Sequence, residues 1–149
     1  MKLSKKSRYG LRALVDLSVN SQNGHVTLSS IAERNHISPQ YLEQVFASLR
    51  KAGIVRSLKG PQGGYLLNDK PENIKVSFIL EVLDGSYQLE PEEILKDIST
   101  SKISVTIQEM VIDVVNKQVD EILQSVSLGD LEKDYLRRSS DQGGNMYFI

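Results

Sequence analysis

The chain has 149 residues, of which 40% are apolar and 25% are charged, and it contains no cysteine. This length fits one domain, or a small domain with an appendage, and is enough to bury a core without crosslinks. The lack of cysteine excludes disulfides, zinc sites with thiolate ligands and iron–sulfur clusters held by cysteine. No stretch approaches the roughly 18 consecutive apolar residues that a membrane helix needs, so we expect a soluble, cytoplasmic protein.

Basic and acidic residues are divided unevenly between the two halves of the chain. Residues 1–70 carry 11 Lys or Arg against 4 Asp or Glu, a balance of +7, whereas residues 71–149 carry 7 against 15, a balance of −8. Such asymmetry predicts that the first half contacts a polyanion such as DNA and that the second half has another role. A chance division of solvated surface charge is the alternative.

Apolar periodicity predicts three short helices at the start of the chain. A helix over residues 7–20 is followed by one that Thr27 can cap and that ends near Asn35-His36, where asparagine tolerates left-handed backbone. Ser38-Pro39 begins a third helix at once, because serine caps free N–H groups and proline needs no donor at the first position. Two short helices with so brief a connection are typical of a helix-turn-helix. The inward residues of the third helix are Leu42, Val45, Phe46 and Leu49.

After the third helix the pattern changes to that of β-strands. Residues 54–58 and 65–67 predict two strands joined by the glycine-rich turn 60–64, so a hairpin wing directly follows the recognition helix. A short amphipathic helix is expected over 77–84. The predicted fold is therefore mainly α with a small β-hairpin wing. Its expected parts are a winged helix-turn-helix domain (1–85), an acidic irregular loop (86–101), dimerisation helices (102–138) and a flexible C-terminal tail (139–149).

The longest periodic stretch predicts an amphipathic helix of about 20 residues, from Ile107 to Val126. The N-terminal domain can cover part of its apolar stripe, but the same helix of a second chain is the better candidate. Ser127 can cap a last helix over 128–138. The residues predicted for the dimer interface are Val111, Val115, Val119 and Ile122.

A recognition helix contacts base edges in the major groove with residues near its N-terminus. Here these candidates are Ser38, Gln40, Tyr41, Glu43 and Gln44. Glutamine can make bidentate contacts to adenine; Glu43 can accept from cytosine N4 or, alternatively, pair with a nearby arginine. The wing candidates are Lys59, Gly60, Pro61 and Gln62, and the candidates for phosphate contacts are Lys5, Arg8, Arg50, Lys51 and Arg56.

The sequence offers little support for catalysis or for a bound metal. His25 and His36 are the only histidines, and neither has a second ligand at metal spacing. No serine lies in a nucleophile-elbow pattern. We therefore expect no enzyme and no cofactor.

Several motifs resemble those of the Rrf-type winged-helix repressors. They are Ser-Arg-Tyr-Gly-Leu-Arg-Ala-Leu (7–14), Ile-Ser-Pro-Gln-Tyr-Leu-Glu-Gln-Val-Phe (37–46), Leu-Arg-Lys-Ala-Gly-Ile-Val (49–55) and Lys-Gly-Pro-Gln-Gly-Gly-Tyr-Leu-Leu (59–67). The resemblance covers most of residues 1–85. It implies a homodimer, swapped or crossed through the long helix, that binds an imperfect palindrome in double-stranded DNA. It also implies DNA contacts from Ser38, Gln40, Glu43 and the wing residues 59–62.

The second half departs from part of this family. The IscR- and NsrR-like branches carry three cysteines before the dimerisation helix, where residues 88–104 of this chain have none, so the role of a cluster sensor does not carry over. The CymR-like branch represses sulfur and cysteine metabolism without those cysteines and ends in a similar short aromatic tail, here Tyr147, Phe148 and Ile149. In that branch the tail is linked to binding of cysteine synthase (O-acetylserine thiol-lyase). Alternatively, these side chains fold back onto the long helix.

The leading hypothesis is a dimeric, sequence-specific transcriptional repressor, and the resemblance to the CymR-like branch implies that it controls sulfur and cysteine metabolism genes. The alternative is a winged-helix adaptor that binds other proteins and no DNA. The balance of +7 around the recognition helix favours the repressor, since an adaptor does not need it.

Overall fold

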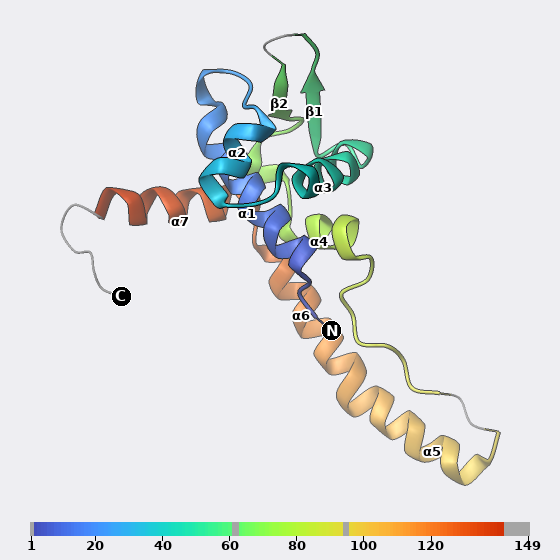
Figure 1. Cartoon of the computed structure of the whole chain (residues 1–149). Helices are drawn as coiled ribbons and strands as arrows, with labels where there is room; N and C mark the ends of the chain where they lie inside the picture. The colour runs from blue at the N-terminus through green and yellow to red at the C-terminus, as the bar shows by residue number, and fades with distance from the viewer. Residues whose placement is uncertain (1, 61–62, 94–95, 142–149) are drawn as a thin grey trace.

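The computed structural model describes residues 2–60, 63–93 and 96–141, so the predicted wing residues Pro61 and Gln62 and the tail residues 142–149 lie outside the described part. Most of the chain is helical, with one small hairpin (Figure 1). In chain order the elements are α1 (Lys5–Asn20), the short 3-10 helix η1 (Ser21–Asn23), α2 (Leu28–Asn35), α3 (Pro39–Lys51), β1 (Val55–Leu58), β2 (Gly64–Leu67), the 3-10 helix η2 (Pro71–Asn73), α4 (Val76–Asp84), α5 (Ile98–Ile107), the π-helical turn η3 (Gln108–Ile112), α6 (Asp113–Ser125) and α7 (Leu128–Asp141).

Hydroxyl side chains cap the first three helices. The Ser4 hydroxyl accepts from the N–H of Ser7 and starts α1 two residues earlier than predicted, while Thr27 and Ser38 cap α2 and α3 as expected. The prediction of a left-handed asparagine after α2 is wrong, because His36 adopts that conformation (φ 54°). Asn35 stays helical, and its amide donates to Asp16 on α1.

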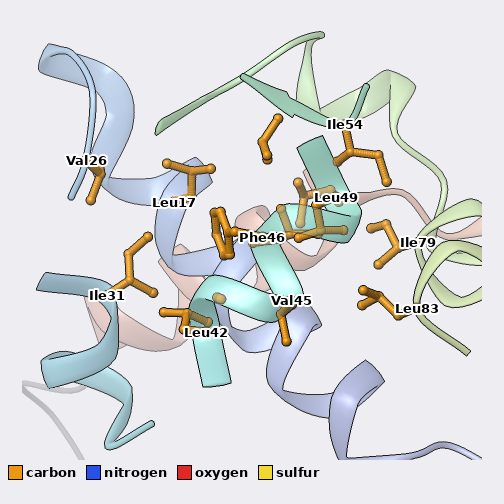
Figure 2. Close-up of a cluster of buried hydrophobic side chains, with 14 of the residues drawn as sticks. Leu17, Val26, Ile31, Leu42, Val45, Phe46, Leu49, Ile54, Ile79 and Leu83 are labelled. Atoms are coloured by element: carbon orange, nitrogen blue, oxygen red, sulfur yellow. The ribbon is translucent and has the colours of Figure 1, made fainter. Parts of the chain in front are cut away.

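One apolar core joins the first four helices and the base of the hairpin (Figure 2). The four side chains predicted to face inward from α3 are all fully buried, which confirms that prediction. The Phe46 ring meets the Tyr65 ring of β2 edge to face, with centroids 4.9 Å apart. The core therefore fixes the wing against the recognition helix.

The wing is an antiparallel pair in which Val55 lies opposite Leu67 and Leu58 opposite Gly64. β1 begins at Val55 rather than at the predicted residue 54. An isolated bridge joins Tyr65 to Val26, the residue before the cap of α2, through two backbone hydrogen bonds of 3.0 and 2.8 Å. The wing is therefore tied to both helices of the helix-turn-helix.

A single long helical rod follows α4 and extends away from the body (Figure 1). It consists of α5, η3 and α6 and runs without a break from Ile98 to Ser125, roughly 42 Å at 1.5 Å per residue. The rod begins at Ile98 instead of Ile107, so the last residues of the predicted irregular loop, 98–101, are helical. Asp97 caps it by accepting from the N–H of Ser99 at 2.9 Å. The last helix ends at Asp141 rather than at residue 138.

The rod joins the body through its C-terminal part, α6. Val119, Leu123 and Val126 pack against a small second cluster made of Val76, Leu80 and Tyr87. The extended segment after α4 lies along the rod and is bound to it by a hydrogen bond. The Leu89 N–H donates to the side-chain oxygen of Asn116 on α6 at 2.7 Å. In the described residues no helix is long and apolar enough to span a membrane.

Candidate nucleic-acid interface

The solvent face of α3 carries the polar side chains predicted to contact bases. Gln40, Glu43 and Gln44 are exposed, and their spacing of three and four residues places them on one side of the helix, opposite its buried side. Ser38 is exposed too, but its hydroxyl already caps the helix. The structure therefore brings the two glutamine amides and one carboxylate together on a surface that a major groove can accept.

Tyr41 has a different position from the other four candidates. Its ring is half-buried and meets the Tyr9 ring of α1 edge to face, with centroids 5.6 Å apart. Lys5 and Arg12 stack on the same Tyr9 ring, with the Lys5 ammonium 5.4 Å and the Arg12 guanidinium carbon 5.2 Å from its centroid. These contacts hold two cations beside the recognition helix. Arg12 is missing from the predicted site, although its spacing of three residues from Tyr9 is a visible signal for this stacking.

A hollow of about 520 Å³ separates α3 from the wing, and Glu43, Arg50 and Gly60 are among the residues that line it. In the described part of the chain Glu43 forms no ion pair, so the predicted alternative of a salt bridge is not made there. Lys59 and Gly60 are exposed at the wing tip, and Gly60 has the positive φ (117°) that favours glycine.

The side chains predicted to contact phosphates are all exposed and lie on three elements. Lys5 and Arg8 lie on α1, Arg50 and Lys51 end α3, and Arg56 lies on β1. The positive charges of Arg50 and Lys51 in the last turn of α3 also interact favourably with the helix dipole and stabilise the helix. The basic residues of α1 and α3 can therefore bind the DNA backbone beside the polar face of α3. Arg56 instead lines a separate hollow with Ser18 and Gln22, so the structure does not bring it to the face of α3.

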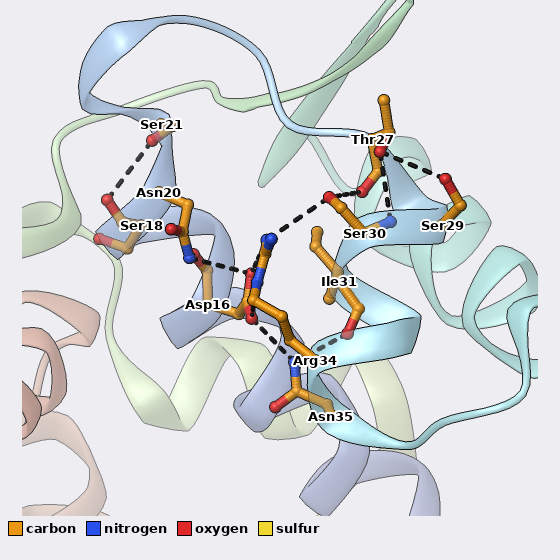
Figure 3. Close-up of polar contacts among 10 residues, drawn as sticks. All are labelled: Asp16, Ser18, Asn20, Ser21, Thr27, Ser29, Ser30, Ile31, Arg34 and Asn35. Carbon is orange, nitrogen blue, oxygen red and sulfur yellow. Dashed lines mark hydrogen bonds and ion pairs between the residues drawn. The ribbon is translucent and has the colours of Figure 1, made fainter.

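One acidic residue of this half, Asp16, is engaged in contacts between helices (Figure 3). The Asp16 carboxylate accepts two hydrogen bonds from the Arg34 guanidinium, at 2.9 and 2.7 Å, and another from Asn35 at 2.9 Å. The hydrogen bonds that Arg34 donates to Asp16 raise the pKa of Arg34, so its guanidinium stays protonated. It fixes α2 against α1, and it neutralises a carboxylate that would otherwise repel DNA.

A second acidic group anchors the start of α1. The Asp84 carboxylate at the end of α4 accepts from the hydroxyls of Ser4 and Ser7. Burial alone would raise the pKa of Asp84, but these hydrogen bonds outweigh burial and hold it below its usual value. The cationic N-terminal turn of α1 is thereby held in place beside α3.

Comparison with known proteins identifies the family of the chain. The model of the Rrf2 family, described as an iron-dependent transcriptional regulator, matches residues 3–134. The chain belongs to the Rrf2 family. The HTH-type transcriptional regulator CymR of Bacillus subtilis (strain 168) is 38% identical over 149 residues, the full length of both proteins. IscR of Aliivibrio salmonicida is 48% identical over 86 residues, 58% of this chain and 51% of that protein.

Solved structures agree with this assignment to the Rrf2 family. The structure of CymR, the global cysteine regulator of B. subtilis, has a TM-score of 0.73 and 36% identity, and the match covers 89% of this chain and 97% of that chain. The structure of T. potens IscR has a TM-score of 0.69 and 36% identity, covering 99% and 94%. The relatives are named transcriptional regulators, so this Rrf2 protein is a DNA-binding regulator and not an enzyme.

The iron dependence in the family's description does not fit the residues of this chain. Segment 88–104 offers hydroxyl, amide, carboxylate and amine groups but neither a thiol nor an imidazole. Within the described ranges, no three His, Cys, Asp or Glu residues come together as a metal site. The donor set is therefore unsuited to an iron–sulfur cluster, and we assign no step to iron.

The long rod carries the remaining predicted site, the dimer interface. Val111 and Ile122 are exposed, at 51% and 59%, and Val115 is half-buried. Val119 instead packs within its own chain, against the cluster of α4 and Tyr87. Further apolar side chains that sequence reasoning left out of the interface are exposed on the same rod, namely Ile103, Ile107, Met110 and Val114. So large an exposed apolar surface is typical of a surface that another protein covers.

Proposed function

We propose that this Rrf2 regulator is a dimeric repressor that binds an imperfect DNA palindrome and controls genes of sulfur and cysteine metabolism. The observation that carries the proposal is the exposed polar face of α3, with Gln40, Glu43 and Gln44 between basic residues of α1 and the wing. Amides and a carboxylate suit base edges, whereas the surrounding cations suit phosphates. The likeness to CymR over the full chain supports the choice of regulated genes, because the solved CymR structure is described as that of a global cysteine regulator.

A titration of duplex DNA with the purified protein at several salt concentrations tests this function. A protein that releases counterions from DNA loses affinity steeply as salt rises. An affinity that does not depend on salt would support the alternative, a winged-helix adaptor for other proteins. Sequencing DNA fragments recovered with the protein from its host would identify the operator, and operators outside cysteine metabolism genes would overturn the proposed regulon.

Two substitutions separate base contacts from phosphate contacts. Gln40→Ala should weaken specific binding by roughly 1–3 kcal/mol and leave binding to random DNA nearly unchanged. Lys59→Ala should weaken both and lower the salt slope by about one for each bound protomer. Equal losses on specific and random DNA for Gln40→Ala would mean that Gln40 only positions the helix.

The proposed dimer rests on the exposed apolar residues of the rod. Val111→Asp and Ile122→Asp should each give monomers, because a carboxylate inside an apolar interface is costly unless it is paired. Val119→Asp is the contrasting variant, since Val119 packs within the chain and its substitution should destabilise the monomer itself. Light scattering that finds intact dimers for both Val111→Asp and Ile122→Asp would move the interface elsewhere.

Cysteine synthase stays a predicted partner. The residues proposed to bind it, Tyr147, Phe148 and Ile149, lie outside the described residues, and the prediction rests on the resemblance to the CymR-like branch. Calorimetry with the purified synthase and the full-length chain tests it. Absence of binding heat would remove this partner and leave the proposed DNA binding untouched.

A further inference from the structure

A wide groove lies between α1, α2 and α7. Figure 1 shows how α7 extends outward from the body. Its volume is about 740 Å³. Its apolar side chains come from two helices, with Leu11, Val15 and Val19 on α1 and Leu131 and Tyr135 on α7. Its polar rim on α1 and α2 is the contact between Asp16, Arg34 and Asn35, with Asn20 beside it (Figure 3).

α7 presents one continuous side to this groove. The lining residues Leu131, Asp134, Tyr135 and Arg138 recur at spacings of three, one and three, so they share a face that runs most of the length of the helix. The buried carboxylate of Glu132 fixes the start of α7, because it accepts from the Ser18 hydroxyl at 2.9 Å. The groove therefore has a rigid wall that leads directly toward the C-terminal end of the chain.

The charges around the groove disfavour a cationic occupant and favour an aromatic one. Both carboxylates of the lining are already neutralised, Asp16 by Arg34 at 2.7 Å and Asp134 by Arg138 at 2.6 Å. Arg12 forms no ion pair with the described residues and stacks on an aromatic ring, so its guanidinium can offer a second face to another ring. A cationic ligand would find no free carboxylate here, whereas an aromatic segment would meet apolar side chains and arginine faces.

We propose that the chain's own C-terminal segment, residues 146–149, occupies this groove by running back along α7. All four of its residues, Met146, Tyr147, Phe148 and Ile149, are apolar or aromatic, and residues 142–149 carry no charged side chain. Gly143-Gly144 permits the reversal of direction after the helix. The segment joins α7 to the first helix of the helix-turn-helix, beside the Asp16–Arg34 contact.

The length of the tail is sufficient for this path. α7 ends at Asp141, and Leu131 lies ten residues earlier, about 15 Å back along the helix at 1.5 Å per residue. Residues 142–149 can span at most roughly 26 Å when extended, at about 3.3 Å per residue. After a turn at the glycines, residues 146–149 therefore reach the stretch between Arg138 and Leu131.

A tryptophan placed in the tail tests the proposal in the full-length protein. The chain has no tryptophan, so Phe148→Trp introduces a single reporter. We expect its emission to lie to the blue of that in the denatured chain, and acrylamide to quench it several-fold less. Tyr135→Ser in this background should return both readouts to the values of an exposed tryptophan.

Leu136→Ser is the matched control, because Leu136 is as exposed as Tyr135 (48% against 49%) and does not line the groove. Its emission and quenching should equal those of the parent Phe148→Trp protein. A solvent-exposed reporter in the parent would overturn the proposal, as would equal effects of the two serine variants. A shielding that disappears on dilution would also overturn it, because the groove would then hold the tail of a second copy. None of these readouts involves DNA, so they are separate from the tests of the proposed function.

Discussion

The bridge between the wing and the helix-turn-helix rests on a glycine, and Gly64→Ala should break it. A Cβ atom at Gly64 would lie 2.6 Å from the carbonyl oxygen and 2.8 Å from the carbonyl carbon of Val26. Backbone atoms cannot rotate out of the way as a side chain can, so β2 must move from Val26. That movement opens the two hydrogen bonds between Val26 and Tyr65, of 3.0 and 2.8 Å.

The expected loss of stability follows from those two bonds. Each backbone hydrogen bond contributes about 0.5–1.5 kcal/mol net, so losing both costs roughly 1–3 kcal/mol. The lower chain entropy of the unfolded alanine variant offsets about 0.4–1 kcal/mol of this. The remaining loss, roughly 1–2 kcal/mol, corresponds to a melting temperature about 2–8 °C lower for a chain of this size.

Thermal unfolding followed by circular dichroism measures the loss of stability, and fluorescence anisotropy with labelled DNA measures the affinity for DNA. Gly64→Ala should lower both the melting temperature and the DNA affinity, since the displaced wing no longer aligns with α3. Lys59→Ala is the matched control on the same hairpin: it should lower only the affinity, because its side chain is exposed and forms no part of the bridge. An unchanged melting temperature for Gly64→Ala would refute this account of the wing.

Three further substitutions test polar contacts that position the interface. Asp84→Asn should reduce the dependence of the unfolding free energy on pH in the acid range. Because the folded pKa of Asp84 is lowered, the stabilisation by its carboxylate is present above the unfolded pKa of about 3.9 and disappears as pH falls through the lower folded pKa. Urea unfolding of both proteins across pH 5 to 3 would detect this difference. Arg34→Lys should cost about 1 kcal/mol in the same urea assay, because lysine cannot make the two-pronged contact to Asp16; no loss would mean that the pair is dispensable. Glu132→Ala should cost roughly 1–3 kcal/mol, since it leaves the buried Ser18 hydroxyl without its acceptor, and Glu121→Ala on the exposed side of α6 is the control that should change nothing.

The recognition helix and wing could be predicted from the sequence because their signals are local. Ser38 caps α3 through the N–H three residues on, and the four inward residues of α3 follow the helical period directly. The glycines of the turn indicated a tight hairpin, but sequence alone could not separate their roles. Gly60 is needed for its positive φ, whereas Gly63 and Gly64 are needed because other backbone atoms approach them closely.

The errors arise where a distant residue decides a local structure. Asparagine is the better left-handed residue in isolation, yet Asp16 on another helix engages the Asn35 amide and His36 makes the turn instead. The start of the rod was missed because α5 has no continuous apolar stripe: Ile98 and Ile103 are 75% and 62% exposed and pack against no core. Periodicity places Val119 on the apolar face of the rod but does not identify the neighbour that covers this side chain, which in the structure packs against α4 and Tyr87.

Helix α1 connects every part of the molecule that the proposed function requires. Gly10 allows close approach of α4, since a Cβ atom there would collide with the Leu83 side chain. Tyr9 meets Tyr41 of the recognition helix, Asp16 holds α2, and Ser18 holds Glu132 of α7. Helix α7 is therefore connected to the helix-turn-helix through α1, by the Ser18–Glu132 and Asp16–Arg34 contacts, whereas α4 contacts both α1 and, directly, α3. The acidic half of the chain thus has a direct mechanical connection to the surface that faces DNA.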